Sequence, residues 1–211
     1  MKEKTLKGLL VGKFSLKRFM RSLLIIYVLV GLWAFFLSDR LIFLPRPSSY
    51  SDNGDFIDLT SGGKGVKIAA LYLPNAEARY TILYSHGNAE DLGDILPRLR
   101  DLRDIGFAVF AYDYRGYGLS EGRPTVGGAY EDIKAAYDYL RQELNVPPEQ
   151  IVLYGRSVGS GPSVDLASRM PVAGLVVESG FTSVFRVALP VALYPFDKFP
   201  NIDYAPDIRC P

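Results

Sequence analysis

The chain has 211 residues, of which 48% are hydrophobic and 22% charged, so a folded core is possible and wholesale disorder is excluded. The formal net charge is +1, and no basic excess points to nucleic acid as a partner. The single cysteine, Cys210, excludes an intrachain disulfide and a cysteine-rich metal site, and no metal or organic cofactor is expected. His86 is the only histidine, which constrains every mechanism that needs an imidazole base.

The N-terminal region is first basic and then apolar. Lys and Arg greatly outnumber acidic residues in residues 1–21, and residues 22–37 form an uncharged run. This run is somewhat shorter than the ~20 apolar residues that span a bilayer. A second apolar patch at 41–44 extends it. We expect a cytoplasmic basic segment at 1–21 and an uncleaved membrane anchor at 22–44. Because the basic residues precede the anchor, the positive-inside rule places the rest of the chain on the outer (periplasmic or luminal) side. Membrane lipid is then a partner of the anchor.

Two other interpretations of the apolar run stay open. A cleaved signal peptide needs small residues before its cleavage site, whereas Trp33, Phe35 and Phe36 are bulky. A buried core helix is the other interpretation, and the basic flank and the apolar residues on all sides of the helix argue against it.

After a proline-rich linker at 45–49, strands alternate with helices. Apolar runs predict the strands, and helical spacing of apolar residues predicts the helices. The expected strands are 56–59, 66–73, 80–85, 107–112, 151–154 and 174–177, and the expected helices are 92–102, 129–144 and 163–168. A glycine turn joins the first two strands as a hairpin, and the other strands are apolar on both faces. This pattern predicts an α/β fold with a mostly parallel sheet that helices cover on both faces.

The strongest chemical signal is the sequence from Gly155 to Gly159, which fits the G-x-S-x-G nucleophile elbow with Ser157 as the nucleophile. A strand leads into it and a helix with few bulky side chains follows. Gly155 and Gly159 would let this strand and helix approach closely. The N-terminal N–H groups of the helix would favour negative charge developing at the site. The alternative is a plain glycine-rich turn.

A second signal is His86-Gly87-Asn88, directly after the strand at 80–85. In a fold with this elbow, the loop here supplies one oxyanion-hole amide and the residue after the nucleophile supplies the other. We therefore assign the oxyanion hole to the backbone N–H groups of Asn88 and Val158. An ordinary turn at the strand end is the alternative.

His86 has two possible roles. As the only histidine it is a candidate base, but it precedes Ser157, whereas in this fold the histidine follows the serine and the acid. Triads are recognised by geometry and not by order, so this objection is not decisive. The simpler role is a ring that fixes its loop by hydrogen bonds.

Four segments together resemble one family: residues 84–91, 113–122, 155–161 and 199–203. They are similar to the membrane-associated α/β-hydrolase-domain proteins, a group with eukaryotic protein depalmitoylases and many bacterial relatives. The resemblance covers about residues 40–211 and implies a serine hydrolase. Depalmitoylases of the group have a cysteine-rich N-terminus, which this chain lacks, so the resemblance says little about substrate.

The resemblance also implies that the triad aspartate and histidine follow a strand that starts after Cys210-Pro211. The 50–211 region is therefore expected to be a partial α/β-hydrolase domain without its last strands and helices, with the strand at 174–177 as an exposed, aggregation-prone edge. Asp165, Asp197, Asp203 and Asp207 do not follow apolar strands. Glu178, at the end of the 174–177 strand, is the better placed stand-in, although a structural role is favoured for it.

Two functions from different classes are compatible with the sequence. The first is a serine hydrolase that cleaves an ester or thioester through an acyl-serine, present as a truncated chain. The second is a catalytically inactive, membrane-tethered remnant or binding module. For the segment 113–122 the favoured role is structural, as a glycine-containing turn that packs the strand end, and a local ion pair between Arg115 and Asp113 is the alternative.

Overall fold

The computed structural model describes residues 15–189 and 191–211. The chain divides into two compact units, residues 1–38 and residues 39–211, and each is described by itself.

The first unit contains one long helix, α2 (Leu16–Leu37), whose 22 residues are long and apolar enough to cross a membrane. At ~1.5 Å per residue such a helix is about 33 Å long, close to the thickness of a hydrocarbon core. It begins earlier than expected and includes Lys17, Arg18 and Arg21 in its first turns. The rest of the predicted basic segment, residues 1–14, lies outside the described residues.

The second unit begins at Asp39, earlier than the residue 50 expected from the sequence. It opens with the short helix α3 (Asp39–Ile42). Phe43 is 3% exposed and packs in the hydrophobic core of this unit, while Leu41 and Leu44 remain more than half exposed. The predicted extension of the anchor at 41–44 is therefore a part of the second unit, because Phe43 is buried in its core.

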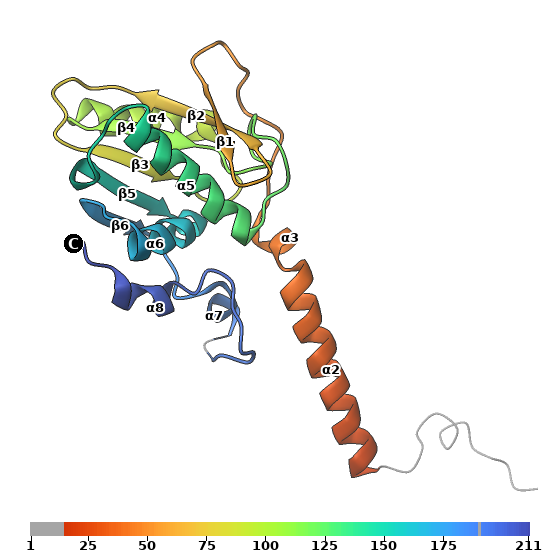
Figure 1. The fold of residues 1–211 in the computed structure, drawn as a ribbon. Coiled ribbons are helices and arrows are strands. Elements are labelled where there is room, and N and C mark those ends of the chain that lie inside the picture. The colour runs from red at the N-terminus through yellow and green to blue at the C-terminus, as the bar shows by residue number, and fades with distance from the viewer. Residues whose placement is uncertain (1–14, 190) are drawn as a thin grey trace, which may run out of the picture. The chain divides into compact units, whose positions relative to one another are not determined.

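A six-stranded sheet in the order β1-β2-β4-β3-β5-β6 forms the centre of the second unit (Figure 1). β2 runs antiparallel to both of its neighbours, β1 and β4, whereas β4, β3, β5 and β6 are parallel. The strands are β1 (Ile57–Ser61), β2 (Val66–Leu73), β3 (Thr81–Ser85), β4 (Ala108–Tyr112), β5 (Ile151–Arg156) and β6 (Gly174–Glu178).

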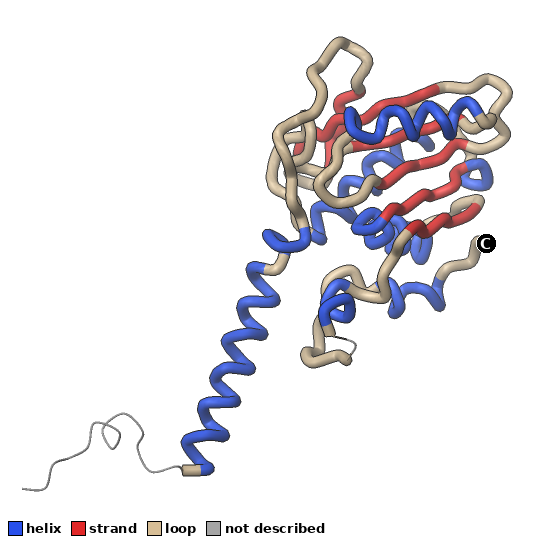
Figure 2. Tube along the Cα trace, turned by 180° about the vertical axis from the view of Figure 1, so that it is seen from behind, coloured by secondary structure: helices blue, strands red, loops and turns tan. Residues whose placement is uncertain are grey.

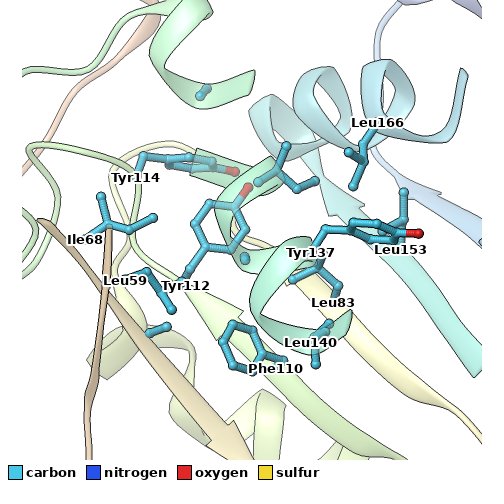
Figure 3. Packing of buried hydrophobic residues seen from close by; sticks show 14 of the residues in the cluster. Leu59, Ile68, Leu83, Phe110, Tyr112, Tyr114, Tyr137, Leu140, Leu153 and Leu166 are labelled. Carbon is cyan, nitrogen blue, oxygen red and sulfur yellow. The ribbon is translucent and has the colours of Figure 1, made fainter. Parts of the chain in front are cut away.

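Helices cover both faces of the sheet, as Figures 1 and 2 show from opposite sides. On one face, α5 (Val126–Gln142) and α6 (Ser160–Arg169) pack on the larger core cluster, and on the other α4 (Leu92–Asp104) packs on the smaller one. The larger cluster is built around Tyr112, Tyr114 and Phe110, with Leu83 and Leu153 from neighbouring strands (Figure 3). The remaining helices are α7 (Val184–Ala188), α8 (Asn201–Tyr204) and short 3-10 turns at Pro148–Gln150, Ser157–Gly159 and Ala205–Asp207.

The predicted strands and helices are all present, with boundaries shifted by a few residues. The edge strand β6 is less bare than expected. The N–H of Leu175 donates to the carbonyl of Pro211 at 2.9 Å, although Val176 and Val177 remain 41% and 46% exposed. Pairing with this later segment satisfies part of the edge.

Candidate active site

The sheet register places the two predicted site loops side by side. Ser85, the last residue of β3, pairs with Gly155 near the end of the adjacent parallel strand β5. Because the carboxyl ends of parallel strands meet at one edge of the sheet, the loop that starts at His86 and the turn that contains Ser157 leave the sheet together. This edge is the candidate active site.

Ser157 lies in a strained turn between β5 and α6. Its φ is +51°, in the left-handed region that residues with a side chain rarely adopt. The 3-10 turn Ser157–Gly159 leads directly into α6, and the hydroxyl of Ser160 donates to the carbonyl of Ser157 at 2.6 Å. Strain of this kind persists only where the surrounding structure enforces it, and it is frequent at catalytic residues. The side chain of Ser157 is partly exposed.

Two glycines make this tight turn possible. A Cβ on Gly155 would lie 2.6 Å from the carbonyl oxygen of Gly159 and 2.8 Å from Cα of Ser160. A Cβ on Gly159 would overlap the backbone carbonyls of Ser85 and His86. Both glycines are therefore needed for close packing of β5, α6 and the end of β3, as the elbow motif predicts.

The predicted oxyanion amides lie at this edge. Val158 is buried and follows Ser157 in the first helical turn, where N–H groups have no partner within the helix. In the described part of the chain, no acceptor takes up the N–H of Asn88, while both the oxygen and the NH₂ of its side chain have partners. The Asn88 amide oxygen accepts from the hydroxyl of Tyr117 (2.7 Å) and the N–H of Leu44 (2.9 Å), and its NH₂ donates to the carbonyl of Ile42 (2.7 Å). The loop is thus fixed from outside while its backbone amide stays available.

His86 is fully buried and its ring is engaged within its own loop. Nδ1 lies 2.8 Å from the carbonyl of Gly87, and since a carbonyl only accepts, Nδ1 carries the proton. Nε2 lies 3.3 Å from the Asp113 carboxylate, and the ring packs against Tyr114 in a tilted arrangement with 4.4 Å between centroids. This arrangement favours the structural role of His86 over the role of base.

An ion pair that the sequence did not indicate joins the two loops. Arg156, the residue before the nucleophile, donates to the Glu90 carboxylate at 2.6 Å, and Glu90 accepts the N–H of Gly87 at 2.6 Å. The hydrogen bond with Glu90 raises the pKa of the Arg156 guanidinium. Arg156 and Glu90 are 66 residues apart, so a sequence pattern gives no sign of their contact. The pair ties the end of β5 to the oxyanion loop.

Glu90→Ala should loosen the oxyanion loop without unfolding the protein. The substitution leaves the Gly87 N–H without its acceptor, while Arg156 is 36% exposed and can be solvated. We expect faster amide hydrogen–deuterium exchange in residues 86–90 and unchanged exchange in β4. Lys134→Ala, which breaks an ion pair with Asp138 on α5, is the matched control. Equal exchange of residues 86–90 in wild type and Glu90→Ala would contradict the restraint.

The structure also shows the partners of Glu178 and of Arg115, two charged residues for which the sequence analysis considered roles. Glu178 accepts from the hydroxyl of Tyr154 (2.6 Å) and from Arg98 (2.7 Å), and the Tyr154 hydrogen bond is the main cause that lowers the pKa of Glu178. These contacts favour a structural role for it. The alternative considered for Arg115, an ion pair with Asp113, is wrong. Arg115 instead binds Asp132 at 2.8 Å, because the first turns of α5 lie beside the loop after β4.

Asp113 is instead fully buried and organises the neighbouring segments. It accepts the hydroxyl of Tyr50 and the N–H of Leu92 (2.9 Å), in addition to facing His86. Among the described residues no cluster of His, Cys, Asp or Glu has the arrangement of a metal site.

Comparison with known proteins places these features in context. Residues 76–196 match the family model described as serine aminopeptidase, S33. The human alpha/beta hydrolase domain-containing protein 17B is 41% identical over 185 residues, which are 85% of this chain and 63% of the relative. The Caenorhabditis elegans alpha/beta hydrolase domain-containing protein aho-3 is 46% identical over 142 residues, which are 66% of this chain and 42% of the relative. The chain thus spans less than two thirds of the length of these relatives.

Solved structures agree with the predicted fold class. The Pyrococcus furiosus esterase Pf2001 superposes with a TM-score of 0.64 at 22% identity and covers 81% of this chain and 75% of its own. An alpha-beta hydrolase from Vibrio vulnificus gives a TM-score of 0.54 at 21% identity, with 73% of this chain and 56% of its own covered. At these identities the likeness concerns the fold.

Proposed function

The chain belongs to the serine aminopeptidase (S33) family of α/β-hydrolases, and from this membership we propose that it carries the nucleophile and oxyanion hole of a serine hydrolase that cleaves esters or thioesters. Family membership supports a hydrolase, and the substrate bond and the individual roles are our proposal. The substrate is a small ester or thioester, which includes an acyl group attached to a larger molecule.

In the proposed reaction, Oγ of Ser157 attacks the carbonyl carbon of the substrate while a base takes the hydroxyl proton. The carbonyl oxygen becomes an oxyanion, which accepts hydrogen bonds from the N–H groups of Asn88 and Val158. Collapse of this intermediate expels the alcohol or thiol, protonated by the same base, and leaves an acyl-serine. Water then attacks the acyl-serine by the same sequence of proton transfers and releases the carboxylic acid.

The observation that carries the proposal is the left-handed φ of +51° at Ser157, in a turn that lies beside the His86–Asn88 loop. A plain glycine-rich turn would place a glycine, not a serine, at the strained position. Ser157 is partly exposed in this turn, at the edge of the sheet where the His86–Asn88 loop also begins. This is the geometry that the elbow motif requires.

The base is the open part of the mechanism. His86 is the only histidine in the 211 residues, and its ring nitrogens face Gly87 and Asp113. We propose that hydrolysis requires a histidine and an acid beyond those of the present sequence. The alternative function, a membrane-tethered non-catalytic module, is favoured by the same engagement of His86.

We further propose that α2 anchors the protein in a membrane, with the N-terminus cytoplasmic and the hydrolase unit on the outer side. The 22-residue apolar helix supports the anchor. Basic residues at its N-terminal end support the orientation through the positive-inside rule.

The proposed function is tested with matched substrates in detergent: p-nitrophenyl esters of increasing acyl length, an acyl thioester and an aminoacyl p-nitroanilide. Each is assayed with the 211-residue chain and with a version extended by any coding sequence that follows it. We expect ester and thioester cleavage by the extended version. Faster cleavage of the anilide would favour an aminopeptidase instead. Inactivity of both proteins toward every substrate would favour the non-catalytic module.

A further inference from the structure

The peptide group between Ser157 and Val158 carries one half of the proposed oxyanion hole. A trans peptide is planar, so its C=O and its N–H point in opposite directions. Whatever holds the carbonyl oxygen of Ser157 therefore also sets the direction of the Val158 N–H. A carbonyl that is held toward the body of α6 turns this N–H toward the open N-terminal end of the helix.

Ser160 binds that carbonyl with two donors. Its hydroxyl donates to the carbonyl oxygen of Ser157 at 2.6 Å, and its backbone N–H donates to the same oxygen. A carbonyl oxygen has two lone pairs, so both are occupied by the same residue. Ser160 is fully buried, and water therefore does not compete for either bond.

Asn201 lies behind Ser160 and directs the proton of its hydroxyl. The Asn201 NH₂ donates to the carbonyl of Phe181 at 3.0 Å, which fixes the orientation of the amide because a carbonyl only accepts. The same NH₂ donates to Oγ of Ser160 over a longer distance, 3.4 Å. Since Oγ accepts from Asn201, its own proton is left for the carbonyl of Ser157.

The segment 199–203, which the family resemblance includes and the proposed reaction does not use, holds Asn201 in place. Phe199 is fully buried in spite of a left-handed φ of +48°, and its ring lies where a Cβ on Gly161 would be. Asn201 itself is 7% exposed, and among the described residues its Oδ1 has no hydrogen-bond partner. The side chain is thus held through its NH₂, the group that faces Ser160.

We propose that Ser160, supported by Asn201, is a positioning residue of the oxyanion hole. Its hydroxyl holds the Ser157–Val158 peptide so that the N–H of Val158 points at the oxyanion. This inference rests on the proposed function, and neither side chain touches the substrate. An oxyanion forms only during the reaction, so a peptide that is held less firmly should slow the chemical step and leave substrate binding unchanged.

Ser168 offers a matched control on the same helix. Its hydroxyl donates to the carbonyl three residues earlier, that of Asp165, at 2.8 Å, as the hydroxyl of Ser160 does to Ser157. Such bonds are common wherever serine lies in a helix. Ser168→Ala therefore removes a bond of the same kind near the other end of α6, away from the oxyanion peptide.

Nuclear magnetic resonance of the 211-residue chain in detergent tests the positioning directly. With 13C in the serine carbonyls and 15N in the valines, a spectrum that selects directly bonded pairs shows only valines that follow a serine: Val158, Val164 and Val184. Ser157→Ala identifies the Val158 signal by removing it. Each remaining signal reports on the carbonyl and the N–H of one peptide group.

We expect Ser160→Ala to shift both the Ser157 carbonyl and the Val158 N–H, and Ser168→Ala to leave them in place. Asn201→Leu should shift the same signal by less, and should add nothing in the Ser160→Ala background, because Asn201 acts through Ser160. An unchanged Val158 signal in Ser160→Ala would overturn the proposal, as would an equal shift in Ser168→Ala.

Ester hydrolysis by the extended version tests the consequence. Loss of a whole oxyanion donor costs about 10²–10³ in rate, and one donor to the peptide remains in Ser160→Ala, so we expect kcat to fall about tenfold with KM unchanged. An unchanged kcat, or a rise in KM alone, would overturn the positioning role. If the extended wild type is inactive, the proposed function is rejected, and the spectra still decide whether Ser160 holds the peptide.

Discussion

Ser157→Ala is expected to abolish covalent labelling by a fluorophosphonate probe. The probe reacts with an activated serine hydroxyl and stays attached through the oxygen that attacks it, so the alanine variant has no atom to label. The 211-residue chain itself should label at least about 10³-fold more slowly than an extended protein that supplies a histidine and an acid, since a lone serine hydroxyl is a weak nucleophile. Labelling is measured as a rate by gel fluorescence, and the adduct is located by mass spectrometry.

Ser168→Ala is the matched control for this experiment. Ser168 lies on α6, is also partly exposed and donates only to the carbonyl of Asp165 (2.8 Å), so its loss should leave labelling unchanged. Rapid labelling of Ser157 in the 211-residue chain would contradict the inference about the base and would direct attention to His86. An adduct on another residue in the extended protein would reject Ser157 as the nucleophile.

Gly159→Ala is expected to destabilise the hydrolase unit by about 3 kcal/mol or more, since backbone atoms cannot yield as a flexible side chain does. The φ of Gly159 is −64°, so alanine is compatible with the backbone and the effect is purely steric. The added methyl group would overlap the carbonyl oxygens of Ser85, the last residue of β3, and of His86, the first residue after it. For a unit of this size the loss corresponds to a fall in melting temperature of about 6–12 °C. Circular dichroism in detergent measures it.

Gly127→Ala provides the comparison for that result. Gly127 lies in the first turn of α5, and a Cβ there meets no atom within 4 Å. The substitution should leave stability unchanged or raise it by up to about 1 kcal/mol through helix propensity. Equal melting temperatures for Gly159→Ala and wild type would mean that the elbow does not pack against the end of β3 as described.

The order of strands and helices was predictable because it depends on local patterns. Apolar runs and helical spacing predicted every strand of the sheet and the helices α4, α5 and α6, since burial of apolar side chains fixes their period along the chain. The elbow was equally visible, because the strained φ at Ser157 and the close packing at Gly155 and Gly159 require glycines at fixed positions. The roles of Ser157, Asn88 and Val158 remain predictions from these patterns.

Only the tertiary structure determined the partners of the charged and polar side chains. The sequence suggested Asp113 as the partner of Arg115, two residues away, whereas packing of α5 brings Asp132 to it. The same applies to Glu90, which meets Arg156 only because β3 and β5 are neighbours in the sheet. Phe43, read from the sequence as part of the membrane anchor, is instead buried in the hydrolase core. The spacing of apolar residues along the chain predicts which residues are buried. The partners of a residue that are distant in sequence depend on how helices and strands pack, so the local spacing does not predict them.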